Sequence, residues 1–100
     1  MQDLSTVRLN VDMNNYTTNG IGILDCREGS SVSNAPSGFN DMGILRVTKN
    51  NYGVLQEVFK DGDDTVYIRN KWGNDWRPWV RIDNFGCNTL AELKAALANV

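Results

Sequence analysis

The three tryptophans of this 100-residue chain, Trp72, Trp76 and Trp79, all lie within one short segment of its C-terminal half. An indole ring buries a large apolar surface and needs a partner for its N–H group. Three such rings in one segment either build the core of a small β domain or form a surface that stacks on a flat ligand such as a sugar ring. The chain must therefore adopt a fold that either buries these three rings or exposes them at its surface.

Composition and charge indicate a globular domain and argue against several other classes of protein. Apolar residues make up 41% and charged residues 22%, as in ordinary globular domains, and the length fits a single domain over residues 1–100. A net charge of −2 without a basic stripe argues against nucleic-acid binding. No apolar run approaches the roughly 20 residues of a membrane span, so we expect no membrane insertion. The start, Met1-Gln2-Asp3, lacks an export signal, which favours synthesis in the cytoplasm or a piece of a longer protein.

Alternation of apolar and polar residues predicts a mainly β fold. The clearest case is residues 6–13, where Val7, Leu9, Val11 and Met13 would share one face of a half-buried strand. A meander follows a long loop over residues 28–41, and its turns contain Gly, Asn and Asp. The predicted strands cover residues 6–13, 21–26, 42–48, 54–60, 64–70 and 79–83. We expect a small antiparallel β sandwich built around this meander.

The C-terminal segment, residues 88–100, predicts one α-helix. Thr89 and Glu92 form a capping box, in which each side chain satisfies a backbone N–H of the first turn. Apolar residues then recur at helical spacing: Leu90, Leu93, Leu97 and Val100. Helices shorter than about 12 residues are marginal alone in water, so this one must pack either on its own sheet or on copies of itself.

The chain lacks the residues of common catalytic sites. There is no histidine, which removes the commonest metal ligand and general base. Cys26 and Cys87 therefore have no histidine partner, and without an export signal we expect buried free thiols rather than a disulfide, although the pairing stays open. Gly20-Ile21-Gly22 lacks the lysine and helix start of a phosphate-binding loop.

Acidic residues offer two weak alternatives. Asp25, Glu28 and Asp41 flank the long loop, but nothing in the sequence fixes the separation that a pair of glycosidase carboxylates requires. Asp61-Gly62-Asp63-Asp64 has the wrong order for an EF-hand and fits a solvated hairpin turn. We therefore expect no enzyme activity, no metal and no cofactor.

The candidate ligand-binding site combines aromatic and amide side chains. An aromatic surface beside amides and a carboxylate suits a sugar, whose rings stack while its hydroxyl groups take hydrogen bonds. The candidate residues are Trp72, Asn74, Asp75 and Trp76 in one loop and Asn50, Asn51 and Tyr52 in a turn. The alternative is that Trp72 and Trp76 close one end of the sandwich. Trp79, on the last predicted strand, is expected to be structural.

Four motifs in order resemble the knob domain of R-type pyocin and phage tail fibres. They lie within residues 14–83: Tyr16-Thr17-Thr18-Asn19-Gly20, Asn34-Ala35-Pro36, Val66-Tyr67-Ile68-Arg69 and Trp76-Arg77-Pro78-Trp79-Val80-Arg81. Each is weak alone, and their order around a meander makes the resemblance fairly specific. The chain departs from the pattern in having no fibre shaft and in its C-terminal helical segment.

The resemblance implies a small, mostly antiparallel β domain near the distal end of a tail fibre. It also implies a homotrimer within a virion tail, contacts with other tail proteins, and attachment of the particle to a bacterial surface glycan. The motif residues look like determinants of the fold, so no binding residue is carried over from the family. Two alternatives remain: a structural tail protein that binds no sugar, and a small glycan-active enzyme, against which the missing histidine argues.

Overall fold

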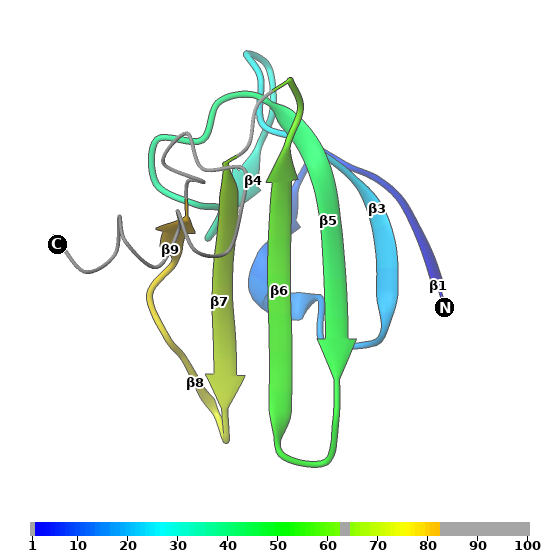
Figure 1. Cartoon of the computed structure of the whole chain (residues 1–100). Helices are drawn as coiled ribbons and strands as arrows, with labels where there is room; N and C mark the ends of the chain where they lie inside the picture. The colour runs from blue at the N-terminus through cyan, green and yellow to red at the C-terminus, as the bar shows by residue number, and fades with distance from the viewer. Residues whose placement is uncertain (1, 63–64, 83–100) are drawn as a thin grey trace, which may run out of the picture.

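The computed structural model describes residues 2–62 and 65–82, and within these ranges strands are the main regular element (Figure 1). The elements are β1 (Gln2–Val7), β2 (Val11–Asp12), the 3₁₀ helix η1 (Met13–Asn15), β3 (Gly20–Asp25), β4 (Val32–Ser33), β5 (Met42–Lys49), β6 (Gly53–Lys60), β7 (Val66–Trp72), β8 (Asp75–Trp76) and β9 (Val80–Ile82). The mainly β prediction is confirmed. The predicted helix over residues 88–100 lies outside the described residues.

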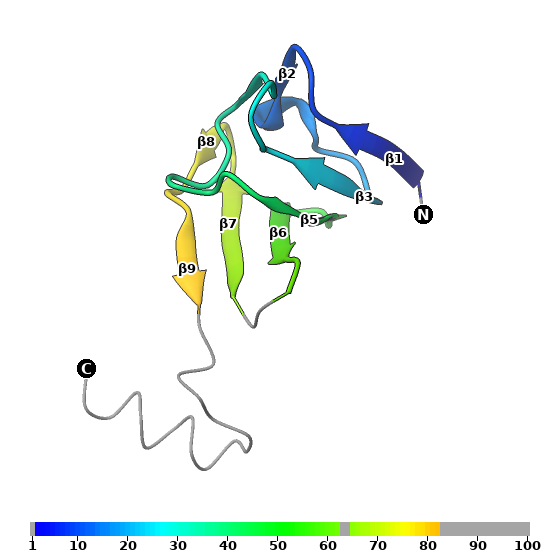
Figure 2. The ribbon, with the colours of Figure 1, turned by 90° about the horizontal axis from the view of Figure 1, so that it is seen from above.

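One sheet contains most of the strands, in the order β1-β3-β5-β6-β7-β8, with β9 also paired to β7. The meander β5-β6-β7 is antiparallel throughout, as the alternation predicts. Its turns suit the geometry, since Gly62 in the β6–β7 connection has a φ of 81°, a conformation that glycine adopts without strain. The sheet is strongly twisted: seen from above, β1 and β3 run at a steep angle to β7 and β9 (Figure 2).

The N-terminal part differs from the expected antiparallel arrangement. Strand β1 pairs with β3 in parallel, so the sheet is mixed. The single strand expected over residues 6–13 is instead split into the end of β1, the short β2 and the start of η1. The break lies at Asn10, whose φ of 54° cannot continue a strand, and Leu9 is exposed instead of facing the core.

The second layer is smaller than a full sandwich sheet. It consists of the parallel pair β2–β4, helix η1 and the long loop, which together cover the inner face of the large sheet. The fully enclosed apolar residues come from both layers: Val7, Met13, Leu24, Phe39, Leu45, Val47, Val54, Val58 and Tyr67. Phe39 and Tyr67 meet edge to face, with ring centroids 5.4 Å apart, so the long loop is anchored directly on β7.

A buried carboxylate ties the long loop to the sheet. Asp25, only 2% exposed at the end of β3, accepts from Arg8 Nη1 at 2.7 Å and from Arg27 Nη2 at 3.0 Å. Its other oxygen accepts from the backbone N–H of Arg27 at 3.1 Å. Hydrogen bonds from Arg27, with the charge of Arg8 in support, lower the pKa of Asp25 to about 2. Asp25 therefore acts as a structural anion.

A buried cation organises the opposite side of the core. Arg69 on β7 is 6% exposed, and its guanidinium lies over the rings of Trp76 at 4.0 Å and Trp79 at 4.6 Å. Its Nε donates to Gln56 Oε1 at 2.9 Å, and the Gln56 amide donates to the carbonyl oxygens of Met13 at 2.7 Å and Tyr16 at 2.9 Å. Burial lowers the pKa of Arg69 to about 10, so the group stays cationic at neutral pH.

The resemblance motifs meet at this cluster. Tyr16 contributes a carbonyl oxygen, and the indole N–H of Trp79 donates to the carbonyl oxygen of Asn34 at 2.9 Å. Asn34 also donates from its side chain to Asp12 at 2.7 Å and has a positive φ of 60°. The four motifs therefore mark one structural network, and the expectation that Trp79 is structural agrees with its place beside the core.

Replacing Asp25 by Asn should destabilise the fold in a pH-dependent manner. Because the folded pKa lies below the usual value of 3.8, the ionised carboxylate stabilises the fold above about pH 4, and this contribution is lost as the pH falls toward 2. We expect D25N to be less stable than wild type at pH 7, with the two converging between pH 4 and pH 2. Urea unfolding across this range measures the difference, and a constant gap would contradict the assignment.

Replacing Gln56 by Leu should cost about 2 kcal/mol or more in the free energy of unfolding, because it removes three hydrogen bonds in and beside the core, including the one to the buried Arg69 Nε. Chemical denaturation at pH 7 measures the loss. Thr48→Val, an exposed change on the neighbouring strand, serves as the control and should shift stability by less than about 0.5 kcal/mol. Equal effects of the two changes would show that the amide bridge is unimportant.

Candidate ligand-binding site

An exposed pair of aromatic rings lies at one end of the sheet. Tyr52, in the β5–β6 turn, and Trp72, at the end of β7, stack with ring centroids 6.3 Å apart and planes within 13° of parallel. Their residues are 72% and 60% exposed, well above the rest of the aromatic residues described. We call this pair the aromatic platform. Strand register creates it, since Gly53 pairs with Trp72 and so sets Tyr52 beside the indole.

The turn that carries Tyr52 is held by a single amide. The side-chain oxygen of Asn50 accepts from the backbone N–H groups of Tyr52 at 2.8 Å and Gly53 at 2.9 Å, and the Asn50 N–H donates to the Gly53 carbonyl at 3.0 Å. The N–H of Lys49 donates to the side chain of Asn19 at 2.6 Å, which joins the turn to the preceding loop. These bonds fix the turn, so Tyr52 is presented on a rigid element.

Gly53 is required beneath the platform. A side chain there would run into the carbonyl oxygen of Lys71 and would also approach the Trp72 ring. Glycine therefore permits β6 to pair closely with β7 at the point where the two rings meet.

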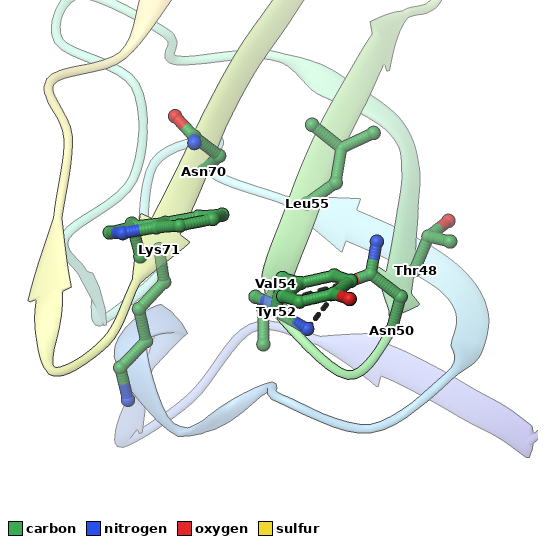
Figure 3. Close-up of a pocket in the computed structure, with 9 residues that line it drawn as sticks. Thr48, Asn50, Tyr52, Val54, Leu55, Asn70 and Lys71 are labelled. Atoms are coloured by element: carbon green, nitrogen blue, oxygen red, sulfur yellow. Dashed lines mark hydrogen bonds between the residues drawn. The ribbon is translucent and has the colours of Figure 1, made fainter.

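Two hollows flank the platform. The outer hollow has a volume of about 220 Å³ and is lined by Thr48, Asn50, Tyr52, Gly53, Val54, Leu55, Asn70, Lys71 and Trp72. Figure 3 shows Leu55 and Asn70 on one side of this hollow, whereas the Lys71 side chain extends in the opposite direction. The second, which we call the lysine hollow, has a volume of about 340 Å³ and is lined by Thr17, Lys49, Asn50, Asn51, Tyr52, Gly53, Val54, Lys71 and Gly73.

The structure brings together four of the seven predicted site residues. Tyr52 and Trp72 form the platform, Asn50 lines both hollows, and Asn51 lines the lysine hollow. Sequence reasoning missed Lys49 and Lys71, which lie just beyond the predicted strands 42–48 and 64–70 but belong to β5 and β7 in the structure. The two lysines join the site because β5, β6 and β7 pair with one another, and this pairing is known only from the sheet register.

The other three predicted residues lie elsewhere. Trp76 is half-buried, packs against the core and supports Arg69, so its ring belongs to the structural network. Asn74 is exposed in the tight β7–β8 turn, next to Gly73 with its φ of 64°, and Asp75 is exposed at the start of β8; both line neither hollow. They remain near the platform because Asp75 pairs with Trp72.

The thiol and the carboxylates near the long loop have defined surroundings. Burial and the nearby Asp25 carboxylate raise the pKa of Cys26 to about 11, so its thiol is protonated at neutral pH and a poor nucleophile. Asp41 lies 3.8 Å from Lys60, and Asp25 is held by arginines.

Over residues 2–62 and 65–82, no group of three potential metal ligands comes together. No helix in this part of the chain is long and apolar enough to cross a membrane. Cys87 lies outside the described residues.

Comparison with known proteins relates this fold to a tail fibre. No family model matches the chain, and no curated protein matches its sequence. A solved structure of an N-truncated R2-type pyocin tail fibre has a similar fold, with a TM-score of 0.67 and 18% sequence identity. The match covers 91% of this chain but 36% of the fibre chain. The chain therefore has a tail-fibre-like fold and spans about 36% of the length of that fibre.

Proposed function

We propose that this chain is a receptor-binding module of a phage or pyocin-like tail fibre, equivalent to a knob domain, and that it attaches the particle to a bacterial surface glycan. The observation that carries the proposal is the exposed aromatic platform with an amide-rich turn, on a fold similar to that of a pyocin tail fibre. In this proposal the protein is part of the virion tail, contacts other tail proteins and acts without enzyme activity, metal or cofactor.

The geometry of the platform suits a sugar chain. Apolar faces of sugar rings can pack on Tyr52 or Trp72, while Asn50 and Asn51 offer amide groups to hydroxyls. Tyr52 and Trp72 are largely exposed, which fits internal units of a polymer better than a fully enclosed small molecule. Weak single sites suffice when several copies act together, and a homotrimer would supply that avidity.

Removing the platform should abolish glycan binding without unfolding the protein. We expect Trp72→Ala and Tyr52→Ala each to weaken binding to cells or surface polysaccharide about tenfold or more, because each removes a stacking face. Trp72→Phe retains a ring and should retain part of the affinity. Leu9→Ala, an equally exposed apolar residue away from the site, is the matched control. Unchanged binding by a folded W72A protein would refute the proposed site.

A second candidate function is a structural tail component that binds no sugar. One observation favours it: the outer face of the sheet, opposite the core, carries a continuous apolar row across five strands. Its members are neighbours by register: Ile23, Ile44, Phe59, Val66 and Ile82. Ile21 and Val80 extend it, and five of these residues are more than 40% exposed. Monomeric proteins seldom display so contiguous an apolar face, so assembly with other copies or tail proteins would cover it.

A charged side chain in the apolar row of the outer face should disrupt assembly. If the outer face joins copies of this chain, Ile44→Glu will reduce the molar mass in solution from that of a trimer to that of a monomer, since burying the carboxylate between copies is unfavourable. Size-exclusion chromatography with light scattering gives the mass, and Leu9→Glu, also exposed but outside the row, should leave it unchanged. A monomeric wild type would show that this face does not drive self-association.

A further inference from the structure

We propose that the glycan recognised here is anionic, and that its carboxylate or phosphate group binds between Lys49 and Lys71 while an adjacent ring packs on the aromatic platform. This inference rests on the proposed function and specifies the chemistry of its ligand. The decisive feature is the lysine hollow, which lies directly beside the Tyr52 ring and has two ammonium-bearing residues in its lining.

The register places the two lysines in one row of the sheet. Lys49 on β5 pairs with Val54 on β6, and Val54 pairs with Lys71 on β7. The three residues therefore share a face, and the two lysine backbones are separated by two strand spacings, about 9–10 Å. Side chains of this length can bring both ammonium groups to one anion in the hollow that they line.

Within residues 2–62 and 65–82, neither Lys49 nor Lys71 forms an ion pair. The ion pairs among the described residues involve Arg8, Arg27, Arg46 and Lys60. Lys71 has a weaker contact, its Nζ lying 5.9 Å from the centre of the Trp76 ring, and this leaves its charge uncompensated. In a chain with 12 acidic and 10 basic residues, two lysines that line one hollow without an ion-pair partner among the described residues stand out from the general surface.

The rest of the lining favours an oxyanion. Thr17, Asn50 and Asn51 contribute a hydroxyl and two amides, and no carboxylate lines this hollow among the described residues. Asp75, at the start of β8, pairs with Trp72 but lines neither hollow. The Asn50 side-chain oxygen is occupied by the turn, which leaves its NH₂ group as a further donor. Hydrogen bonds from cationic donors to an oxyanion are stronger than those between neutral groups.

A uronic or similar sugar acid and a phosphate-substituted sugar share this chemistry. Two lysines act as point charges and accept either group, whereas a neutral sugar gains no ionic attraction from them. The interaction lies at the protein surface, so added salt should screen it and leave the stacking contribution intact. Preference for the anion and its loss with salt are therefore the properties that distinguish this inference from glycan binding in general.

The test uses matched polysaccharides. Binding of the intact chain is measured by calorimetry to a uronic acid polysaccharide and its carboxyl-reduced neutral form, and to a phosphate-substituted polysaccharide and its dephosphorylated form. We expect the wild type to bind at least one anionic member about tenfold more tightly than its neutral counterpart at low salt. The member preferred identifies the source of the oxyanion.

Charge-removing variants connect the preference to the two lysines. Lys49→Gln and Lys71→Gln should each reduce the anion preference, and the double variant should bind the anionic and neutral forms equally while keeping the neutral affinity of wild type. Arg77→Gln, an exposed residue outside the lysine hollow, removes the same charge and should leave the preference unchanged. Urea unfolding confirms that each variant is folded.

Three results would overturn the inference. Equal wild-type affinity for anionic and neutral forms, with platform-dependent binding retained, refutes the anion and leaves the glycan-binding function standing. An anion preference that survives in the double lysine variant places the anion elsewhere. Absence of binding to every polysaccharide refutes the proposed function and this inference together.

Discussion

The guanidinium of Arg69, enclosed between two indole rings, is the interaction on which the rest of this structure depends. A buried cation is costly unless its surroundings compensate it, and here Trp76, Trp79 and the Gln56 amide do so. Gln56 then extends the network to the carbonyl groups of η1, so that the thin second layer is fastened to the large sheet. Arg69 thereby connects Trp76 and Trp79 to the connection after β2.

This arrangement separates the tryptophans by role. Trp76 and Trp79 belong to the interior network, whereas Trp72 continues β7 to its end and emerges into solvent beside Tyr52. The aromatic platform is consequently carried by paired strands and a hydrogen-bonded turn. A site built on such elements keeps its geometry before the ligand arrives, which limits the entropy lost on binding.

Sequence alternation was sufficient for the meander because its strands bury every second residue, and β5, β6 and β7 fall where the pattern places them. It failed at residues 6–13, where apolar residues alternate but Asn10 turns the chain, and it could not foresee the parallel pairing of β1 with β3. Part of the site was predictable, since exposed aromatics and amides can be recognised in a turn. Lys49 and Lys71 were not, because a strand's neighbours are set by register and not by its own sequence.

The apolar row and the aromatic platform occupy different parts of the same sheet: the row crosses the strands on the outer face, and the platform lies at one end of β6 and β7. Copies related by rotation about an axis parallel to these strands could cover their rows against one another while all their β5–β6 turns point the same way. Such an assembly would present a single tip bearing every ligand site, with its direction of approach defined by the strands themselves.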